Sequence, residues 1–282
     1  MRSLSCSSGG SPKSSASASW TIEWNCTASR LTAIDRRPSS NIRAAWRISR
    51  LLLLLIGYAV PHICCVWLRG TSPWPYRFLR AAARICGLEV RSVGPKPYPH
   101  TLLIANHLSW LDILVLGSAT GCAFVSKDRL GNRLIHWLAD QNNTLYVDRS
   151  ARRAAGDQAT SVQAALQRRP PLAIFPEGTT GHGSGLLPFR SSLLAAVAPP
   201  PPEAHVQPVA IDYLSSVREV AWFDESGRAN AMRLLGRQGT IPVTVRLLER
   251  LPAMTDRKAL AALAQERIAA SLAASSSISH PL

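Results

Sequence analysis

Short apolar runs alternate with stretches of mixed polarity over the greater part of the chain. Six apolar runs of four to six residues predict strands, at residues 101–105, 122–126, 144–148, 172–175, 206–211 and 243–247. The stretches between and after them predict helices, at residues 110–117, 129–140, 151–167, 191–198 and 258–274. This alternation is typical of α/β domains, in which helices cover both faces of a mainly parallel sheet. We therefore predict an α/β fold with a largely parallel central sheet flanked by helices, and we expect its chemistry at the carboxyl ends of the strands.

The region before the first of these strands has a different pattern. Residues 51–68 form an apolar run of eighteen residues between arginines, which is the lower limit for a helix that crosses a bilayer. Pro61 and His62 lie inside the run, and a helix broken there would leave backbone groups unpaired in hydrocarbon. Residues 74–88 have the pattern of an amphipathic helix. The two segments predict a membrane-associated helical hairpin that dips into one leaflet; the alternative is a buried core helix followed by a surface helix.

These patterns divide the chain into four expected parts. Residues 1–42 are expected to be a disordered tail rich in Ser and Arg, and residues 43–90 the membrane-associated helical segment. Residues 91–275 are expected to form the α/β domain, followed by a frayed tail at 276–282. For the first tail, an organellar targeting segment and a misassigned start are the alternatives.

Charge adds a preference for polyanionic partners. The chain has 32 Lys and Arg residues against 17 Asp and Glu, which gives a formal net charge of +15. This excess favours a lipid surface, an acidic carrier protein, a phosphorylated substrate or nucleic acid as partner. The six cysteines show no C-x-x-C pair and no Cys/His zinc spacing, so we expect neither a metal site nor a disulfide scaffold.

The sharpest local signal follows the predicted strand at residues 101–105. The segment there reads Asn-His-Leu-Ser-Trp-Leu-Asp and places His107 five residues before Asp112. If a helix begins near Ser109, Asp112 can fold back beside the imidazole and fix its tautomer, which leaves Nε2 free to take a proton from a hydroxyl. The ordinary alternative is a histidine that caps the helix.

Three further signals stand at the ends of other predicted strands. A Pro-Glu-Gly corner, Phe-Pro-Glu-Gly-Thr at residues 175–179, places the carboxylate of Glu177 and free backbone amides at a strand end, although an ordinary β-turn has the same pattern. Arg149 follows the strand at 144–148 and could grip a phosphate or carboxylate. Lys127 follows the strand at 122–126 and could polarise a carbonyl or contact an anion.

Taken together and in this order, the four signals resemble the lysophospholipid acyltransferase family, of the 1-acylglycerol-3-phosphate acyltransferase type. The likeness extends from about residue 46 to 270, and its hallmark is N-H-x4-D followed by F-P-E-G-T. The resemblance implies that His107 is the general base and Asp112 its orienting partner. It implies a role in substrate binding for the remaining site residues, which are Asn106, Lys127, Arg149, Glu177, Gly178, Thr179 and Arg190.

One position departs from the pattern of the glycerol-phosphate acyltransferases, which usually continue F-P-E-G-T-R. This chain has Thr180 there, so an expected phosphate-binding cation is missing, and Arg190 could replace its charge. The segment 187–193 resembles the branch that acts on lyso-ornithine lipid. The sequence therefore leaves two acceptors open, 1-acylglycerol-3-phosphate first and lyso-ornithine lipid as the alternative.

The resemblance also implies a mechanism and partners. The acceptor hydroxyl would attack the thioester of acyl carrier protein or coenzyme A directly, without a cofactor or metal, in phospholipid biosynthesis. Because thioester donors are cytosolic, we expect the domain at the cytoplasmic face of the inner membrane.

Three rival functions have weaker support in the sequence. A lipase or esterase would need G-x-S-x-G, and Ser184 lacks the glycine two places before it. A metal hydrolase would use His107, Asp112, His136 and His182, yet the chain has no helix-paired histidine motif. A non-catalytic basic membrane-binding module is the rival from another class; nucleic-acid binding is disfavoured because no such fold signature is present.

Overall fold

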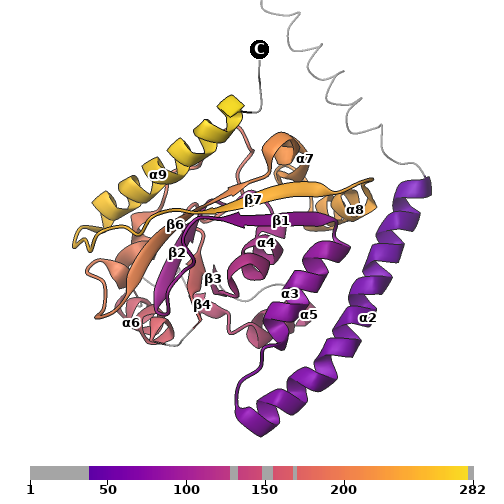
Figure 1. The fold of residues 1–282 in the computed structure, drawn as a ribbon, viewed down its shortest axis with the longest axis horizontal. Coiled ribbons are helices and arrows are strands. Elements are labelled where there is room, and N and C mark those ends of the chain that lie inside the picture. The colour runs from indigo at the N-terminus through magenta and orange to yellow at the C-terminus, as the bar shows by residue number, and fades with distance from the viewer. Residues whose placement is uncertain (1–37, 128–132, 148–154, 168–169, 279–282) are drawn as a thin grey trace, which may run out of the picture.

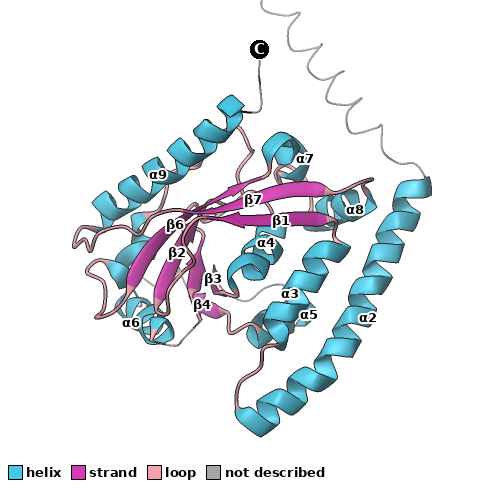
Figure 2. Ribbon diagram, viewed as in Figure 1, coloured by secondary structure: helices cyan, strands magenta, loops and turns pink. Residues whose placement is uncertain are grey.

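The sheet and its helices are described by a computed structural model that covers residues 38–127, 133–147, 155–167 and 170–278. Seven strands form the sheet (Figures 1 and 2): β1 (Leu88–Val93), β2 (Thr101–Ala105), β3 (Ala123–Lys127), β4 (Leu145–Val147), β5 (Leu172–Ile174), β6 (His205–Asp212) and β7 (Ile241–Leu247). Their order is β1-β7-β6-β2-β5-β3-β4. Every neighbouring pair is parallel except β6 and β7. The predicted α/β fold with a largely parallel sheet is confirmed.

The one antiparallel pairing decides where the strands end. Strands β2 to β6 share one direction. Because β7 pairs with β6 in the antiparallel sense and β1 pairs with β7 in the parallel sense, β1 and β7 run in the opposite direction. The carboxyl ends of β2, β5, β3, β4 and β6 therefore lie at one edge of the sheet. This edge is the place where an α/β sheet normally carries its chemistry.

Helices cover both faces of the sheet, as the alternation along β2 requires. Leu103 and Ala105 of β2 belong to one buried cluster, together with residues of α3 (Trp74–Ile85), α4 (Leu111–Thr120) and α8 (Gly227–Gly236). Leu102 and Ile104 belong to another, together with residues of α6 (Ala155–Leu166), the 3-10 helix η2 (Ser191–Val197) and α9 (Arg257–Ile278). A strand that is apolar on both faces is typical of a parallel sheet buried between two helical layers.

A long helix, α2 (Pro38–Arg69), precedes the sheet and lies along the outside of α3 (Figure 1). Within the described residues it is the one helix that is long and apolar enough to cross a membrane, over Ser40–Arg69, and its most apolar stretch of 18 residues has a mean hydropathy of 2.2. The helix continues through Pro61, where the sequence suggested a break. Most of its large apolar side chains are exposed, among them Leu53, Ile56 and Trp67. An exposed apolar surface as large as this one marks a contact with lipid or with another protein.

Polar contacts fasten α2 to the domain at two places. Near its start, the Arg47 guanidinium donates to the carbonyls of Leu234, Leu235 and Arg237 at the carboxyl end of α8, and Arg43 donates to Gly236. These are the carbonyls that a helix leaves without intrahelical partners, and the charge complements the helix dipole.

Near the other end of α2, the two ring nitrogens of His62 contact Ser72 Oγ at 2.8 Å and Gln141 Oε1 at 2.9 Å. Gln141 ends α5 (Arg133–Gln141), so His62 connects α2 to a second helix.

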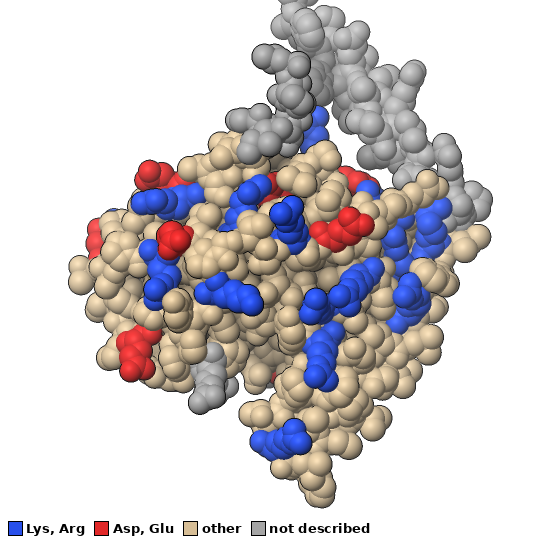
Figure 3. Space-filling view, in the orientation of Figure 1, with Lys and Arg blue, Asp and Glu red and all other residues tan. Residues whose placement is uncertain are grey.

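Basic side chains gather over this part of the molecule (Figure 3). The charged side chains there are arginines, and those of α2 and α3 that are exposed are Arg50, Arg69, Arg77, Arg80 and Arg84. An apolar helix face beside exposed arginines is the combination that binds an anionic lipid surface.

The structure also has elements that the sequence did not predict. β1 lies at the edge of the sheet, and most of its residues are exposed or half-buried. Its short sequence, Leu-Glu-Val-Arg-Ser-Val, therefore lacks an apolar run. The expected domain boundary between residues 90 and 91 falls inside it. The short helix α7 (Val217–Val220) and the longer α8 were not predicted either. Residues 191–198 were expected to be helical, and Ser191–Val197 form the 3-10 helix η2. Of the predicted tail at 1–42, residues 1–37 lie outside the described residues.

Candidate active site

The His107 imidazole stands at the carboxyl end of β2, in the loop that leads into α4. Its Nδ1 lies 2.8 Å from Asp112 Oδ2. Because a carboxylate oxygen accepts, Nδ1 carries the proton and Nε2 has a free lone pair. Nε2 has no hydrogen-bond partner among the described residues, and the side chain is 19% exposed whereas that of Asp112 is 0% exposed. The predicted juxtaposition of these two residues is therefore present.

The Asp112 carboxylate is surrounded by donors. Oδ2 also accepts from the backbone N–H groups of Leu108 at 2.6 Å and Ser109 at 2.9 Å, and Oδ1 accepts from the Tyr213 hydroxyl at 2.6 Å. Four donors therefore satisfy both oxygens of a carboxylate that is fully buried. Burial, the charge of Asp112 and the hydrogen bond to it raise the pKa of Tyr213 well above its ordinary value, so the phenol remains a donor.

Packing fixes the plane of the imidazole. The ring of His107 stacks on that of Phe175, with centroids 4.2 Å apart and an interplanar angle of 16°. Around it, the His107 carbonyl accepts from Gly181 N–H at 2.9 Å, and the Leu108 carbonyl accepts from Trp222 N–H at 3.1 Å. The loop after β2 is thus held by the loops that follow β5 and α7.

Glu177 joins two loops instead of facing an open site. Its Oε1 accepts from His107 N–H at 2.7 Å and its Oε2 from Leu187 N–H at 2.9 Å. The side chain is buried, and this burial raises the pKa of Glu177 although the two N–H bonds act in the opposite direction. Both oxygens are engaged, so the geometry argues against the substrate contact implied by the resemblance and indicates that Glu177 positions His107.

Asn106 has a similar relation to β6. Its amide accepts from Ile211 N–H at 2.8 Å and donates to the Ile211 carbonyl at 3.0 Å. This pair extends the ladder between β2 and β6 by a side chain. Because the amide is buried and engaged, the geometry argues against the predicted contact of Asn106 with substrate and indicates a positioning role.

The other predicted site residues differ in how much of them the structure describes. Gly178 has a φ of +75° at the turn after β5, and Thr179 beside it is exposed. Arg190 is exposed, and its side chain forms no hydrogen bond or ion pair with the described residues. Lys127 ends β3, so its backbone is placed at the predicted edge. Arg149 lies outside the described residues.

Sequence reasoning missed two contributors to the site, Tyr213 and Phe175. Tyr213 is 101 positions away from the aspartate that it contacts, and its sole sequence signal was its place directly after a strand. Phe175 was part of the predicted motif, but stacking on the imidazole was not foreseen.

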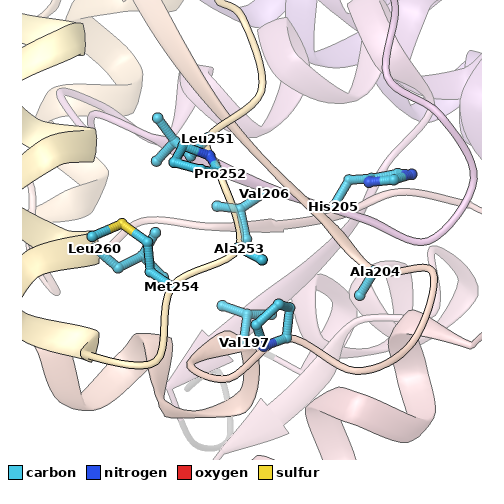
Figure 4. A pocket seen from close by; sticks show the side chains of 10 residues that line it. Val197, Ala204, His205, Val206, Leu251, Pro252, Ala253, Met254 and Leu260 are labelled. Carbon is cyan, nitrogen blue, oxygen red and sulfur yellow. The ribbon is translucent and has the colours of Figure 1, made fainter.

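Two hollows in the surface lie away from this edge. The one in Figure 4 has a volume of about 90 Å³ and is lined by His205 and Val206, at the amino end of β6. A second of about 320 Å³ is lined by Tyr76, Tyr98 and Thr120. Over the described ranges, no three His, Cys, Asp or Glu side chains gather in a way that could hold a metal ion. An imidazole with a free Nε2, backed by a buried carboxylate at the carboxyl edge of an α/β sheet, defines a general acid–base site.

Comparison with known proteins places this site in a family. The acyltransferase family model matches residues 89–212, which include the His–Asp pair and the loop after β5. The lyso-ornithine lipid O-acyltransferase of Rhizobium meliloti is 35% identical over 58% of this chain and 60% of that protein. The enzyme of the same name from Pseudomonas aeruginosa is 36% identical over 66% of this chain and 74% of that protein. The 1-acyl-sn-glycerol-3-phosphate acyltransferase of Neisseria meningitidis is 32% identical over 53% of this chain and 55% of that protein.

The chain belongs to the acyltransferase family. The resemblance inferred from the motifs is therefore confirmed, as is the class of enzyme. A solved structure agrees on the fold: the 1-acyl-sn-glycerophosphate acyltransferase of Thermotoga maritima has a TM-score of 0.56 and 17% identity, over 81% of this chain and 97% of that one. This chain spans 60% of the length of the Rhizobium relative and 55% of the Neisseria relative.

Proposed function

We propose that this protein transfers a fatty acyl group from a thioester donor to the hydroxyl of a lyso-lipid at a membrane surface. The observation that carries the proposal is the 2.8 Å contact between His107 Nδ1 and the buried Asp112, which leaves Nε2 as a base at the sheet edge. Membership of the acyltransferase family and the exposed apolar face of α2 support it.

The reaction needs one base and no protein nucleophile. Nε2 of His107 takes the proton of the acceptor hydroxyl as its oxygen attacks the thioester carbonyl. The tetrahedral intermediate collapses with cleavage of the C–S bond, and the proton on Nε2 passes to the departing thiolate. The products are an ester and a free thiol. Asp112 stabilises the imidazolium that exists between the two proton transfers, and Glu177 and Phe175 keep the ring in place.

For the acceptor, we favour lyso-ornithine lipid. Two relatives quoted above carry that name, and this headgroup has no phosphate to bind. The position at which the glycerol-phosphate enzymes usually have Arg is occupied by Thr180, whose hydroxyl donates to the Trp222 carbonyl at 2.8 Å. This side chain closes a loop and offers no charge. The Neisseria relative supports 1-acylglycerol-3-phosphate as the second candidate, with Arg190 as the exposed cation that would meet its phosphate.

We infer the class of donor from the net charge of the chain, and the location of the catalytic edge from the compartment that contains thioester donors. Acyl carrier protein is acidic and coenzyme A carries phosphates, so a chain with a net charge of +15 suits either donor. Lys127, which ends β3, and Arg149, which lies outside the described residues two positions after β4 in the sequence, are proposed to contact the donor or acceptor. Because thioester donors are cytosolic, the catalytic edge is placed on the cytoplasmic side of the membrane, with no cofactor or metal required.

The test is acyl transfer by membranes that contain the protein. Lyso-ornithine lipid and lysophosphatidate are offered in parallel with labelled acyl carrier protein or acyl coenzyme A, and His107→Ala is the catalytic control. Product from lyso-ornithine lipid that disappears in His107→Ala supports the proposal in full. Product from lysophosphatidate alone would replace the acceptor and leave the mechanism. Equal product from His107→Ala and the parent would refute the mechanism.

A matched variant examines the acceptor further. Thr180→Arg restores the cation of the glycerol-phosphate pattern, and we expect it to raise the ratio of lysophosphatidate to lyso-ornithine lipid turnover. A ratio unchanged by Thr180→Arg would show that position 180 does not select the headgroup.

A further inference from the structure

We propose that Tyr213 is a positioning residue that fixes the Asp112 carboxylate and thereby the His107 base. This inference rests on the proposed function. Tyr213 is 0% exposed, so it cannot touch a substrate, and its hydroxyl lies 2.6 Å from Asp112 Oδ1.

The chain places Tyr213 by continuing the alternation of β6. Val209, Ile211 and Tyr213 all belong to the buried cluster on the α4 side of the sheet, because residues two apart in a strand share a face. Asn106 holds Ile211 by a pair of hydrogen bonds. Directly after, Asp212 Oδ1 accepts from Leu214 N–H at 2.9 Å and fixes the turn that ends the strand. The phenol is therefore delivered to the first turn of α4, where Asp112 lies.

The two oxygens of Asp112 have separate tasks. Oδ2 accepts from His107 and from the N–H groups of Leu108 and Ser109, whereas Oδ1 accepts from Tyr213 alone among the described residues. Three donors hold Oδ2, but without Tyr213 the buried Oδ1 would have no partner among the described residues, and this would favour a rotation of the carboxylate that takes Oδ2 out of line with Nδ1. With Tyr213 in place both oxygens are bound, and Oδ2 stays in line with Nδ1 of His107.

This role predicts an effect on the chemical step and none on binding. Tyr213→Phe keeps the ring and removes the hydroxyl. We expect kcat to fall about 10- to 100-fold, the range for loss of a hydrogen bond to a charged group. The KM values for donor and acceptor should not change, and the melting temperature should stay within a few degrees of the parent. Tyr98→Phe is the matched control. Tyr98 is half exposed and remote from the site, and the loss of its hydroxyl should leave kcat unchanged.

A double-mutant cycle separates positioning from a general structural role. If Tyr213 acts through Asp112, adding Tyr213→Phe to Asp112→Asn should lower kcat by less than about threefold further, because the group that it positions is already altered. Losses that multiply in full would overturn the inference. Tyr213→Leu, which also removes the ring, is the structural comparison: it should lower the melting temperature much more than Tyr213→Phe does.

The activities of His107→Ala and Tyr213→Phe distinguish a wrong role for Tyr213 from a wrong proposed function. If His107→Ala is inactive and Tyr213→Phe has the kcat of the parent, the reaction stands and the role of Tyr213 is refuted. If His107→Ala retains full activity, the proposed function itself fails. If the kcat of Tyr213→Phe and Tyr213→Leu falls only in proportion to their stability, Tyr213 is structural and the inference is overturned.

Discussion

Replacing Asp112 by asparagine tests how the site holds its imidazole. In many His–Asp pairs this change lets the amide nitrogen face the imidazole and produces the wrong tautomer. Here two backbone N–H groups, of Leu108 and Ser109, point at the same oxygen as His107 does. An amide nitrogen facing those donors would be repelled, so the amide oxygen should keep the place of Oδ2. The amide nitrogen then lies beside the Tyr213 oxygen, which can accept from it.

Asp112→Asn should therefore keep the tautomer and the fold, and lose the negative charge. Nδ1 and Oδ2 are 2.8 Å apart, and two unit charges separated by about 4 Å interact with about 4 kcal/mol at an effective dielectric constant near 20. Without it, the imidazolium that follows proton transfer is less stable by this amount. We expect kcat to fall by about a thousandfold.

The assay is initial-rate acyl transfer with saturating donor and acceptor, accompanied by thermal unfolding. Asp256→Asn is the matched control, since Asp256 also accepts from a backbone N–H at the start of a helix but has no histidine beside it. The control should retain the parental rate. A loss of less than tenfold in Asp112→Asn would refute the electrostatic reasoning, and a melting temperature far below that of the parent would refute the retained hydrogen bonds.

Three further predictions concern stability and reactivity. Arg47→Ala should destabilise the protein by about 2 kcal/mol in denaturant titrations, because three carbonyls at the end of α8 lose a charged donor, with partial recovery in Arg47→Lys; an unchanged midpoint would contradict this. Burial raises the pKa of Glu177 above its unfolded value, so the stability linked to that carboxyl is present at low pH and is lost as the pH rises through the folded pKa. The difference in melting temperature between the parent and Glu177→Gln should therefore become less favourable to the parent from pH 4.5 upward, and a difference independent of pH would disprove the assignment. Burial raises the pKa of Cys86 and of Cys122 to about 12, so neither thiol should react with a thiol reagent until the protein unfolds; rapid native labelling at either position would argue against this burial.

The elements that could be predicted from sequence are those whose burial leaves an apolar run. β2 is buried along its whole length and was predicted with its observed bounds. β1 is an edge strand with mostly exposed outer positions, and its sequence is indistinguishable from a polar loop. α8 buries Asn230, Leu234, Leu235 and Gly236, of which only the two leucines are large and apolar, so it too lacks a clear apolar face.

The site shows the same division between local and distant information. His107 and Asp112 are close in the chain, and their contact could be predicted from the spacing together with a helix that begins near Ser109. Substrate contacts were predicted for Asn106 from the family resemblance, and for Glu177 from the resemblance and its place at a strand end. Their actual partners are backbone groups 105 and 70 positions away, which no local pattern reveals. Only the assembled sheet shows that these two residues support the base.

The two sets of polar contacts that hold α2 against the domain have a consequence for the distance between the catalytic base and the bilayer. Arg47 and His62 are fifteen residues apart, about 22 Å along a helix axis. Contacts so widely separated prevent the domain from rocking about α2, and any bilayer that holds the helix also sets the level of His107 Nε2. The acceptor hydroxyl must reach that level through the length of its own headgroup. One helical turn inserted between Arg47 and His62 would move one of these contacts by about 5 Å along the helix axis, so the domain could not keep both.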